Sequence, residues 1–294
     1  MGGGGSYYDR DVSVTRRTTS SFSEQVMSRR SLDPAVDPKN RKLVTEARSP
    51  IVFPFDDTGS MGTLPKVIVD KMPMICGQVA EMQILDDPVI SVATFGDDGN
   101  REPASIQVGD FTQLRNADSW FQRLWLVGNG GGNGIESYEL AMYYYAYMCD
   151  IPNAETPIFI LTGDEGFYAK LPRNRLDRLF GRKFKRNKAT TARQVFADLD
   201  RKFKGNVFIV RKRYSDESRV MRQWTNLMGR SRIALLGEDK AIGDVALGVI
   251  ALASGRYDLD QYLASMAERK QTKTRIANVR ESLVPVAEYC AGRG

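Results

Sequence analysis

Three oxygen-bearing side chains stand at alternating positions directly after the apolar run 51–55: Asp56, Thr58 and Ser60. A carboxylate and two hydroxyls in a tight turn can converge on one point, where they would offer oxygen ligands alone. Oxygen-only ligation is what Mg²⁺, Mn²⁺ and Ca²⁺ prefer. The alternative is that these side chains cap the following helix and that Gly59 only shapes the turn.

A second acid in a comparable position is Asp164, which follows the apolar run 157–162. Apolar runs without polar alternation predict strands that are buried on both faces. The carboxyl ends of parallel strands meet at one edge of a sheet, where the ligand crevice of such folds lies. We therefore expect Asp164 to supply a second carboxylate across the crevice from Asp56.

The elements that must position these residues alternate along the chain. Strands are predicted at 51–55, 89–95, 157–162, 207–210 and 232–236, with a short edge strand at 105–108. Helices are predicted at 64–85, 116–125, 136–149, 192–203, 217–228 and 241–253. The alternation indicates an α/β fold with a doubly wound, mostly parallel central sheet and helices on both faces. The tyrosines of the segment 136–149 fit core packing better than a recognition surface.

The predicted domain organisation has three parts. Residues 1–48 are rich in Gly, Ser, Thr and Arg, which predicts an arm that is flexible or becomes ordered on a partner. Residues 49–255 form the α/β domain, with a basic insertion at 166–191. Residues 256–294 are polar and helix-prone, which predicts a C-terminal helical extension that packs on the domain or on a neighbour.

The segment 55–62 resembles the D-x-[ST]-G-S-M signature of von Willebrand factor A (VWA) domains, whose metal-ion-dependent adhesion site (MIDAS) opens this way. The order of elements from 49 to 254 is also similar to that family, which implies its Rossmann-like fold. By this resemblance Thr58 and Ser60 ligate a metal ion directly, and Asp56 does so directly or through water.

The rest of the ligand set implied by the resemblance lies in two further places. The family usually has a Thr at the start of the helix after its glycine-rich loop, and the segment 128–137 contains none. This loop resembles the variant G-G-G-D-x-x-E, with Asn133 and Glu136 at its two polar positions. The family's T-D-G appears as Thr162-Gly163-Asp164, so the acid is shifted by one and Glu165 is the alternative. The expected ligands of Mg²⁺ (or Mn²⁺ or Ca²⁺) are Asp56, Thr58, Ser60, Asn133, Glu136 and Asp164.

The basic insertion follows Asp164 closely, so we expect it on the same rim as the metal site. It would attract an acidic protein surface or nucleic-acid phosphates, and the interleaved Phe180 and Phe184 suit RNA or single strands. The alternative is a solvated loop without a partner. Its expected partner-binding residues are Lys170, Arg173, Arg175, Arg182, Lys183, Lys185 and Arg186.

The composition excludes several chemistries. The 294-residue chain has no histidine, so Ser-His-Asp and Cys-His nucleophile systems and His-containing zinc sites cannot be built from it alone. Cys76, Cys149 and Cys290 lie in apolar stretches, which favours buried reduced thiols. The first residues show no apolar signal-like region, and no apolar run reaches the ~20 residues of a membrane helix. We expect a cytoplasmic protein without a membrane partner.

The resemblance implies a non-catalytic, metal-dependent protein–protein interaction module that acts as an adaptor or as an assembly or scaffold subunit. Its partner would present an Asp or Glu carboxylate, and an AAA+ ATPase or a large complex would be in keeping with intracellular members of the family. One alternative is an RNA- or polyanion-binding subunit that uses residues 170–188. The other is a haloacid dehalogenase-like phosphatase with Asp56 as nucleophile and Thr162 as phosphate ligand. Such an enzyme needs a general acid two residues after the nucleophile, where this chain has Thr58.

Overall fold

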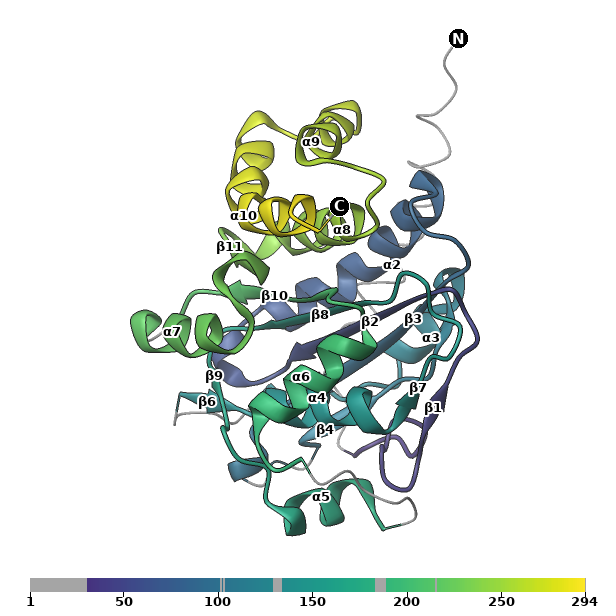
Figure 1. Ribbon diagram of the computed structural model, residues 1–294, viewed down its shortest axis with the longest axis vertical. Coiled ribbons are helices and arrows are strands. Elements are labelled where there is room, and N and C mark those ends of the chain that lie inside the picture. Colours follow the sequence, from purple (N-terminus) through teal and green to yellow (C-terminus); the bar gives the residue numbers. More distant parts are fainter. Residues whose placement is uncertain are drawn as a thin grey trace.

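The chain forms a seven-stranded central sheet with the spatial strand order β11-β10-β8-β2-β3-β4, and β5 also pairs with β3 (Figure 1). The computed structural model describes residues 31–293 apart from 101, 103, 129–133, 183–188 and 215. The pairs from β11 to β3 are parallel, whereas β4 and β5 run antiparallel to β3. The strands are β2 (Ser49–Asp56), β3 (Pro88–Phe95), β4 (Ile106–Val108), β5 (Thr112–Gln113), β8 (Ile158–Gly163), β10 (Val207–Lys212) and β11 (Ile233–Leu236).

Helices cover both faces of this mostly parallel sheet, which confirms the α/β class predicted from the sequence. They are α2 (Leu64–Met82), α3 (Asp118–Phe121), α4 (Tyr138–Tyr147), α5 (Arg173–Phe180), α6 (Ala192–Lys202), α7 (Glu217–Met228), α8 (Ile242–Ala253), α9 (Leu259–Glu268) and α10 (Lys273–Ala291). Two short parallel pairs lie outside the central sheet: β1 (Leu43–Val44) with β7 (Cys149–Asp150), and β6 (Ile135–Glu136) with β9 (Gly166–Phe167).

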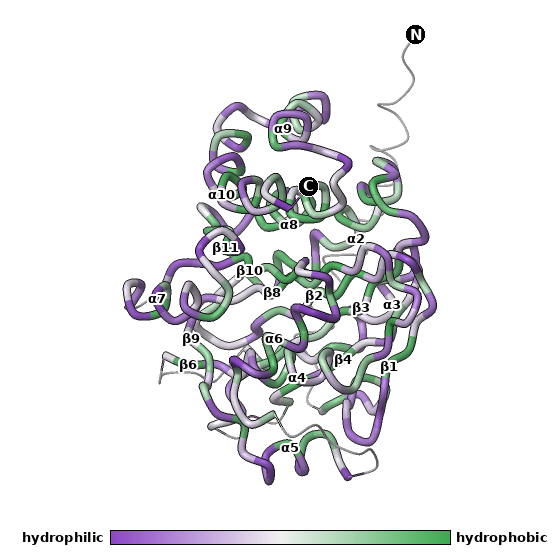
Figure 2. Tube along the Cα trace, in the orientation of Figure 1, coloured by the Kyte–Doolittle hydropathy of each residue, from purple (hydrophilic) through white to green (hydrophobic). Residues whose placement is uncertain are grey.

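Alternate side chains of the central strands enter two separate cores. Ile51, Phe53 and Phe55 of β2 belong to the core that includes α2, α8 and α10. Val52 belongs to the core on the other face, which includes α4 and α6. Because these strands are buried on both faces, their sequences show no polar alternation. In Figure 2 the apolar colour accordingly follows the central strands and α8.

Strand β2 carries a proline in the middle of the sheet. Pro54 has no N–H to donate to a neighbouring strand. The pairing of β2 with β8 is present at Ile51, Val52 and Phe55 and is interrupted between them, at the proline. The pairing with β3 is continuous from 49 to 56. The strand therefore stays in register and delivers its last residue to the carboxyl edge of the sheet.

The structure confirms two predictions of core packing, one for the tyrosines of α4 and one for the cysteines. Tyr143, Tyr144 and Tyr145 of α4 are completely buried. Cys76 and Cys149 are buried free thiols. The third thiol, in α10, is half-buried and also free.

The described part of the segment expected to be an arm, 31–48, packs on the domain, so the predicted boundary at 48 is wrong. Val36 and Leu43 are buried. The Arg41 guanidinium donates to the carbonyl oxygens of Ala35 and Val108, at 2.5 and 2.7 Å. Because the segment as a whole is polar, its composition does not reveal the few apolar residues that attach it to the domain. Residues 1–30 lie outside the described residues.

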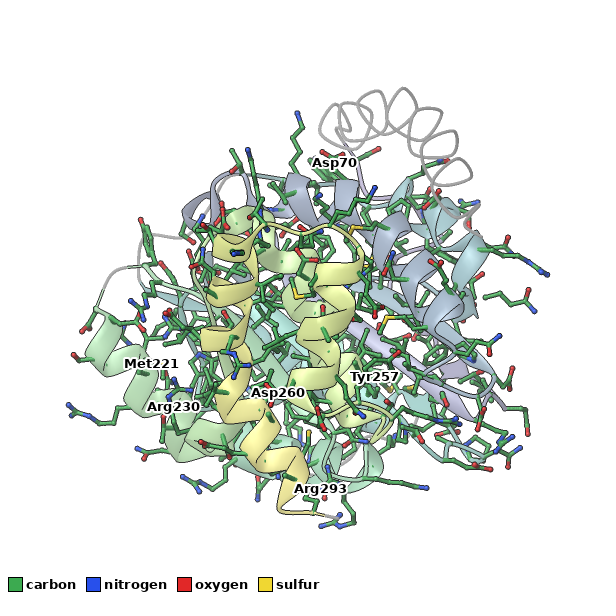
Figure 3. All side chains as sticks on the ribbon, turned by 90° about the horizontal axis from the view of Figure 1, so that it is seen from above. Asp70, Met221, Arg230, Tyr257, Asp260 and Arg293 are labelled. Carbon is green, nitrogen blue, oxygen red and sulfur yellow. The ribbon has the colours of Figure 1, made fainter. Side chains whose placement is uncertain are left out.

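The C-terminal extension packs on its own domain as two helices. Val279, Leu283 and Val286 of α10 are buried in the core that α2 and α8 share. Figure 3 shows Arg293 at the end of α10, and α7, which carries Met221, at one side of the molecule. Within the described ranges, no helix is long and apolar enough to cross a bilayer.

Candidate metal centre at the carboxyl edge of the sheet

The turn after β2 gathers two hydroxyls around Asp56, whose side chain is completely buried. The Asp56 Oδ1 atom accepts hydrogen bonds from the Thr58 backbone N–H (2.8 Å) and from the Thr58 hydroxyl (2.6 Å). The Thr58 Oγ1 and Ser60 Oγ atoms lie 3.1 Å apart. The tight turn thus brings together the three side chains that alternate in the sequence.

Asp164 joins this group from the neighbouring strand. It follows β8, which pairs with β2, and its Oδ1 atom accepts a hydrogen bond from the Ser60 hydroxyl (3.1 Å). Its Oδ2 atom is buried without a hydrogen-bond partner in the described part of the chain. The acid that contacts the turn is therefore Asp164 rather than Glu165.

Tyr138 reaches the same group from α4. Its hydroxyl donates to Asp56 Oδ2 (3.4 Å) and accepts from the Glu165 backbone N–H (3.3 Å). A Cβ atom at Gly163 would stand 1.9 Å from the Tyr138 oxygen, so a residue without a side chain is required at this end of β8. In the sequence, the spacing of Tyr138 does not distinguish it from the other tyrosines of the helix, for which core packing is expected.

Glu136 comes to this edge on β6, where it pairs with Phe167 of β9. Its side chain is completely buried, and neither carboxyl oxygen has a hydrogen-bond partner among the described residues. Burial, followed by the charge of Asp56, raises the pKa of Glu136 to about 11. Such a carboxyl holds a proton at neutral pH unless a cation takes its place. Asn133, the other expected ligand of this loop, lies outside the described residues.

Buried acids crowd this edge of the sheet. Burial, followed by the charge of Asp164, raises the pKa of Asp56 well above its usual range, and burial raises the pKa of Asp164 to about 6. Burial also raises the pKa of Asp57. Five of the buried acids make no ion pair with a described Lys or Arg, so a bound cation would compensate their charge. These five are Asp56, Asp57, Glu136, Asp164 and Glu165.

Two cations at the end of β10 hold the surrounding loops. Arg211 is completely buried, and its guanidinium donates to the Asp164 carbonyl oxygen (2.9 Å) and to the Glu217 carboxylate (2.9 Å). The Lys212 ammonium donates to the Met61 carbonyl oxygen (2.9 Å). The strand predicted at 207–210 extends two residues further, to Lys212, and this extension brings both cations to the site.

The structure corrects the role expected for Arg175. Its side chain is only 12% exposed and lies between Asp98 and Glu139 instead of facing a partner. It donates through Nε to Asp98 and through Nη1 to Glu139 (3.0 Å), and its guanidinium lies 4.8 Å from the Tyr168 ring centre. Burial raises the pKa of Glu139 to about 8 in spite of Arg175. Although burial acts the other way, Arg178 and Arg175 lower the pKa of Asp98.

Other members of the basic insertion stay at the surface. Lys170 and Arg173 are exposed, and the 83% exposed Arg182 side chain pairs with Asp177 (3.1 Å). The insertion is not simply a solvated loop, because its described part contains β9 and α5, and Phe180 is buried. Three further expected partner contacts lie outside the described residues: Lys183, Lys185 and Arg186.

The oxygen atoms at the turn are of the type that hard divalent cations prefer as ligands. Oxygen ligands of octahedral Mg²⁺ lie about 2.1 Å from the ion, which puts neighbouring ligand oxygens ~3.0 Å apart. The two contacts of the Ser60 hydroxyl, with Thr58 and with Asp164, are both 3.1 Å. In the described ranges, no group of three or more Cys, Asp or Glu could hold a metal by itself. The group at the turn is of another kind, since Thr58 and Ser60 contribute hydroxyl oxygens.

Two hollows are present in the described part of the domain. One, of about 360 Å³, lies beside Phe167 between α6 and α7. The other, of about 370 Å³, lies beside Lys212 and Gly237 and is lined mostly by polar groups. Neither hollow is lined by a residue of the acidic turn, which consists of Asp56, Thr58, Ser60 and Asp164.

Comparison with known proteins does not identify a family. No family model matches the chain, and no curated protein matches it. The pilus adhesin SpaC from Lactobacillus rhamnosus GG, in an open conformation, aligns at 8% identity and a TM-score of 0.45 over 73% of this chain and 31% of the adhesin. Proximal thread matrix protein 1 from the mussel byssus aligns at 10% identity and a TM-score of 0.46 over 73% of this chain and 49% of that protein. The chain spans less than half of either protein, and likenesses of this strength establish neither a shared family nor a function.

Proposed function

We propose that the chain is a VWA-type, Rossmann-like domain that binds a protein partner through a divalent cation and acts as an adaptor or scaffold subunit. The support is the D-x-[ST]-G-S-M resemblance at 55–62 together with the position of that segment at the carboxyl edge of a mostly parallel sheet. Thr58, Ser60 and Asp164 would hold the ion, with Asp56 acting directly or through water. Glu136 would complete the acidic surroundings.

The observation that carries the proposal is the continuous chain of contacts from Asp56 through Thr58 and Ser60 to Asp164. A simple capping role for the hydroxyls is not seen. Thr58 makes no side-chain cap hydrogen bond to the 3-10 helix that follows it, and the residue that precedes α2, Thr63, makes none either. The hydroxyl groups face the acids instead of the helix ends.

Charge explains why such a site would bind carboxylates. A divalent ion held by one or two carboxylates and neutral hydroxyls keeps a net positive charge, and it can accept a further oxygen ligand. The turn is accessible at Gly59, which is exposed, and at Ser60, which is partly exposed. A partner's Asp or Glu side chain is the ligand that complements both features.

Binding is favoured over catalysis at Asp56. As a phosphatase nucleophile, this carboxylate would need a free oxygen and a nearby general acid. Its Oδ1 atom already accepts two hydrogen bonds from Thr58, and its Oδ2 atom lies against the Tyr138 hydroxyl. Thr58, at the position of the general acid, donates its hydroxyl hydrogen bond to the Asp56 carboxylate itself. We therefore propose a non-enzymatic role.

The partner is proposed only by its chemistry, an acidic protein segment. An AAA+ ATPase or a large complex remains a prediction from the family resemblance. RNA binding through the basic insertion gains no specific support, because Arg175, Arg178 and Arg182 all pair with acids of this chain.

Calorimetric titration of Mg²⁺, Mn²⁺ and Ca²⁺ into the metal-free full chain tests the proposal. We expect saturable binding that is lost in Ser60→Ala and in Asp164→Asn. Thr63→Ala is the matched control, because this exposed hydroxyl in the same segment contacts Asp239 (3.3 Å) and not the acidic turn. The proposal fails if the wild-type chain binds none of the three ions, or if the two site variants bind like the control.

A further inference from the structure

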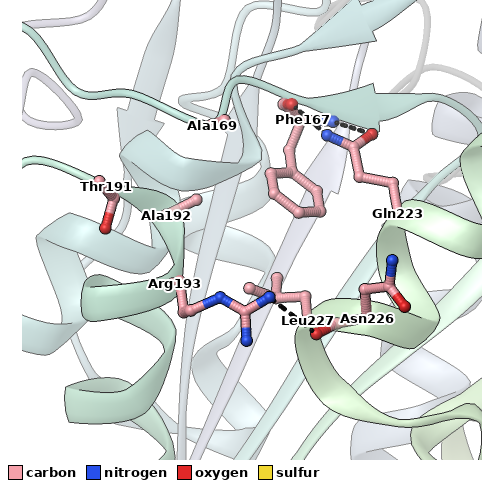
Figure 4. A pocket seen from close by; sticks show the side chains of 8 residues that line it. All are labelled: Phe167, Ala169, Thr191, Ala192, Arg193, Gln223, Asn226 and Leu227. Atoms are coloured by element: carbon pink, nitrogen blue, oxygen red, sulfur yellow. Dashed lines mark hydrogen bonds between the residues drawn. The ribbon is translucent and has the colours of Figure 1, made fainter.

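A groove of about 360 Å³ opens between the first turn of α6 and the second half of α7 (Figure 4). Its walls are mainly apolar and include Phe167, Ala169, Ala192 and Leu227. Arg193 is the one charged side chain among the described residues that line it. An apolar hollow with a cation at its rim fits an apolar side chain carried by an otherwise acidic segment.

The groove is firmly connected to the acidic turn. The Phe167 ring packs edge-on against Trp224 (4.8 Å between ring centres), and Trp224 packs against Tyr138 (4.9 Å). The Tyr138 hydroxyl in turn contacts Asp56. A continuous row of buried, packed side chains therefore links the groove to the acidic turn.

Backbone pairing is not the means by which a partner would bind beside β9. The Gln223 side chain donates to the Phe167 carbonyl oxygen (2.7 Å) and accepts from the Phe167 N–H (3.4 Å), as Figure 4 shows. The Trp224 indole N–H donates to the Glu165 carbonyl oxygen (2.9 Å). Because α7 already satisfies these backbone groups, recognition at the groove has to come from the partner's side chains.

The distance between the two places follows from the chain that joins them. Phe167 follows Asp164 by three residues, so their Cα atoms are at most about 11 Å apart. An extended partner segment advances about 3.3 Å per residue. A carboxylate at the acidic turn and an apolar side chain in the groove would therefore be separated by about three residues at most.

The route between them is basic. Arg219 of α7 is 44% exposed; its Nε atom pairs with Asp216, and its Nη2 atom donates to the Gly134 carbonyl oxygen (3.1 Å). Arg222 is exposed one turn further along the same helix, and Arg193 follows at the groove. Acidic side chains between the carboxylate and the apolar residue of the partner segment would complement these three cations.

We infer that the partner docks through an extended acidic segment, which places one carboxylate at the acidic turn and one apolar side chain in the groove beside Phe167. The inference rests on the proposed function, and it adds a second recognition point and a fixed spacing to it. Specificity then comes from the groove, because many acidic residues could occupy the metal but few would have an apolar neighbour at the right distance.

Selection from a phage-displayed library of random peptides, against the immobilised full chain with Mg²⁺ present, tests the inference. We expect the selected peptides to share an Asp or Glu and a large apolar residue at one constant spacing. A synthetic peptide of the selected sequence is then measured against two matched variants. Ala169→Glu places an acid at an exposed position of the groove and should weaken binding at least about tenfold, whereas Ala197→Glu makes the same change at an exposed position of α6 outside the groove and should leave binding unchanged.

The outcomes separate the inference from the proposed function. Selected peptides that contain the acid but no apolar residue at a constant spacing would overturn the inference alone, as would equal binding by Ala169→Glu and wild type. Failure to select any peptide also counts against it. Peptide binding that is insensitive to both Mg²⁺ removal and Ser60→Ala would overturn the proposed function as well, in agreement with a negative metal titration.

Discussion

Arg175 and Arg182 belong to the same basic insertion, and the structure predicts very different consequences for their loss. Arg175→Ala removes a guanidinium that lies between Asp98 and Glu139, whose side chains are 1% and 0% exposed. Removal of one partner from a buried ion pair costs about 3–5 kcal/mol, because the remaining charge stays buried. Arg182 is 83% exposed, and its loss should change the free energy of unfolding by less than about 1 kcal/mol.

Two features of the site reduce the cost at Arg175. Arg178 still donates to both carboxyl oxygens of Asp98, at 2.7 and 2.6 Å. Glu139, with a pKa of about 8, is largely protonated at neutral pH, so it leaves little uncompensated charge when Arg175 is removed. Loss of the contact with the Tyr168 ring acts in the opposite sense. We therefore expect Arg175→Ala to lower the free energy of unfolding by about 2–4 kcal/mol.

Urea denaturation of the two variants beside the wild type, followed by tryptophan fluorescence and far-ultraviolet circular dichroism, measures this difference. Arg175→Lys should recover only part of the loss, because an ammonium cannot reproduce the planar, forked donors of a guanidinium. If Arg175→Ala and Arg182→Ala lost equal amounts of stability, the reasoning that α5 is anchored by buried ion pairs would be refuted.

Three further predictions concern the surrounding structure. Glu139→Gln removes a carboxyl whose pKa is raised from 4.5 to about 8 on folding. The folded chain binds this proton more tightly than the unfolded chain does. In denaturation experiments at a series of pH values, the wild type should therefore lose stability relative to the variant as pH rises from about 5 to 8. Lys202→Met leaves the carbonyl oxygens of Tyr145 and Ala146 without the ammonium that caps them (3.2 and 2.6 Å), and should cost about 1–3 kcal/mol with faster amide exchange at the end of α4. Leu283→Ala should cost about 2–5 kcal/mol in chemical denaturation, because it opens a cavity in the core beneath α10; a loosely attached C-terminal extension would show almost no change.

The arrangement of the acidic turn could be predicted because it depends on local and topological rules. Apolar runs such as 157–162 identify strands that are buried on both faces, and parallel strands bring their carboxyl ends to one edge. Those two facts suffice to bring Asp56 and Asp164 together. The alternation of Asp56, Thr58 and Ser60 within one turn adds the two hydroxyl groups to this pair of acids.

The features that the sequence did not indicate depend on contacts between distant segments. Arg175 and Arg182 have the same charge and similar neighbours in the sequence, and only the buried Asp98 and Glu139, brought from two other segments, distinguish them. The N-terminal boundary was misplaced for a related reason. A single apolar residue such as Val36 has little effect on composition, yet it anchors the chain once a complementary surface exists.

Anomalous scattering from crystals grown with Mn²⁺ tests the central claim most directly, because it locates the ion as well as detecting it. We expect a peak at the carboxyl edge of the sheet, about 2.0–2.3 Å from the hydroxyl oxygens of Thr58 and Ser60, with Asp164 beside it, and no such peak in Ser60→Ala crystals. A peak located elsewhere, or none at this turn at a saturating Mn²⁺ concentration, would contradict a metal-dependent binding site formed by these residues.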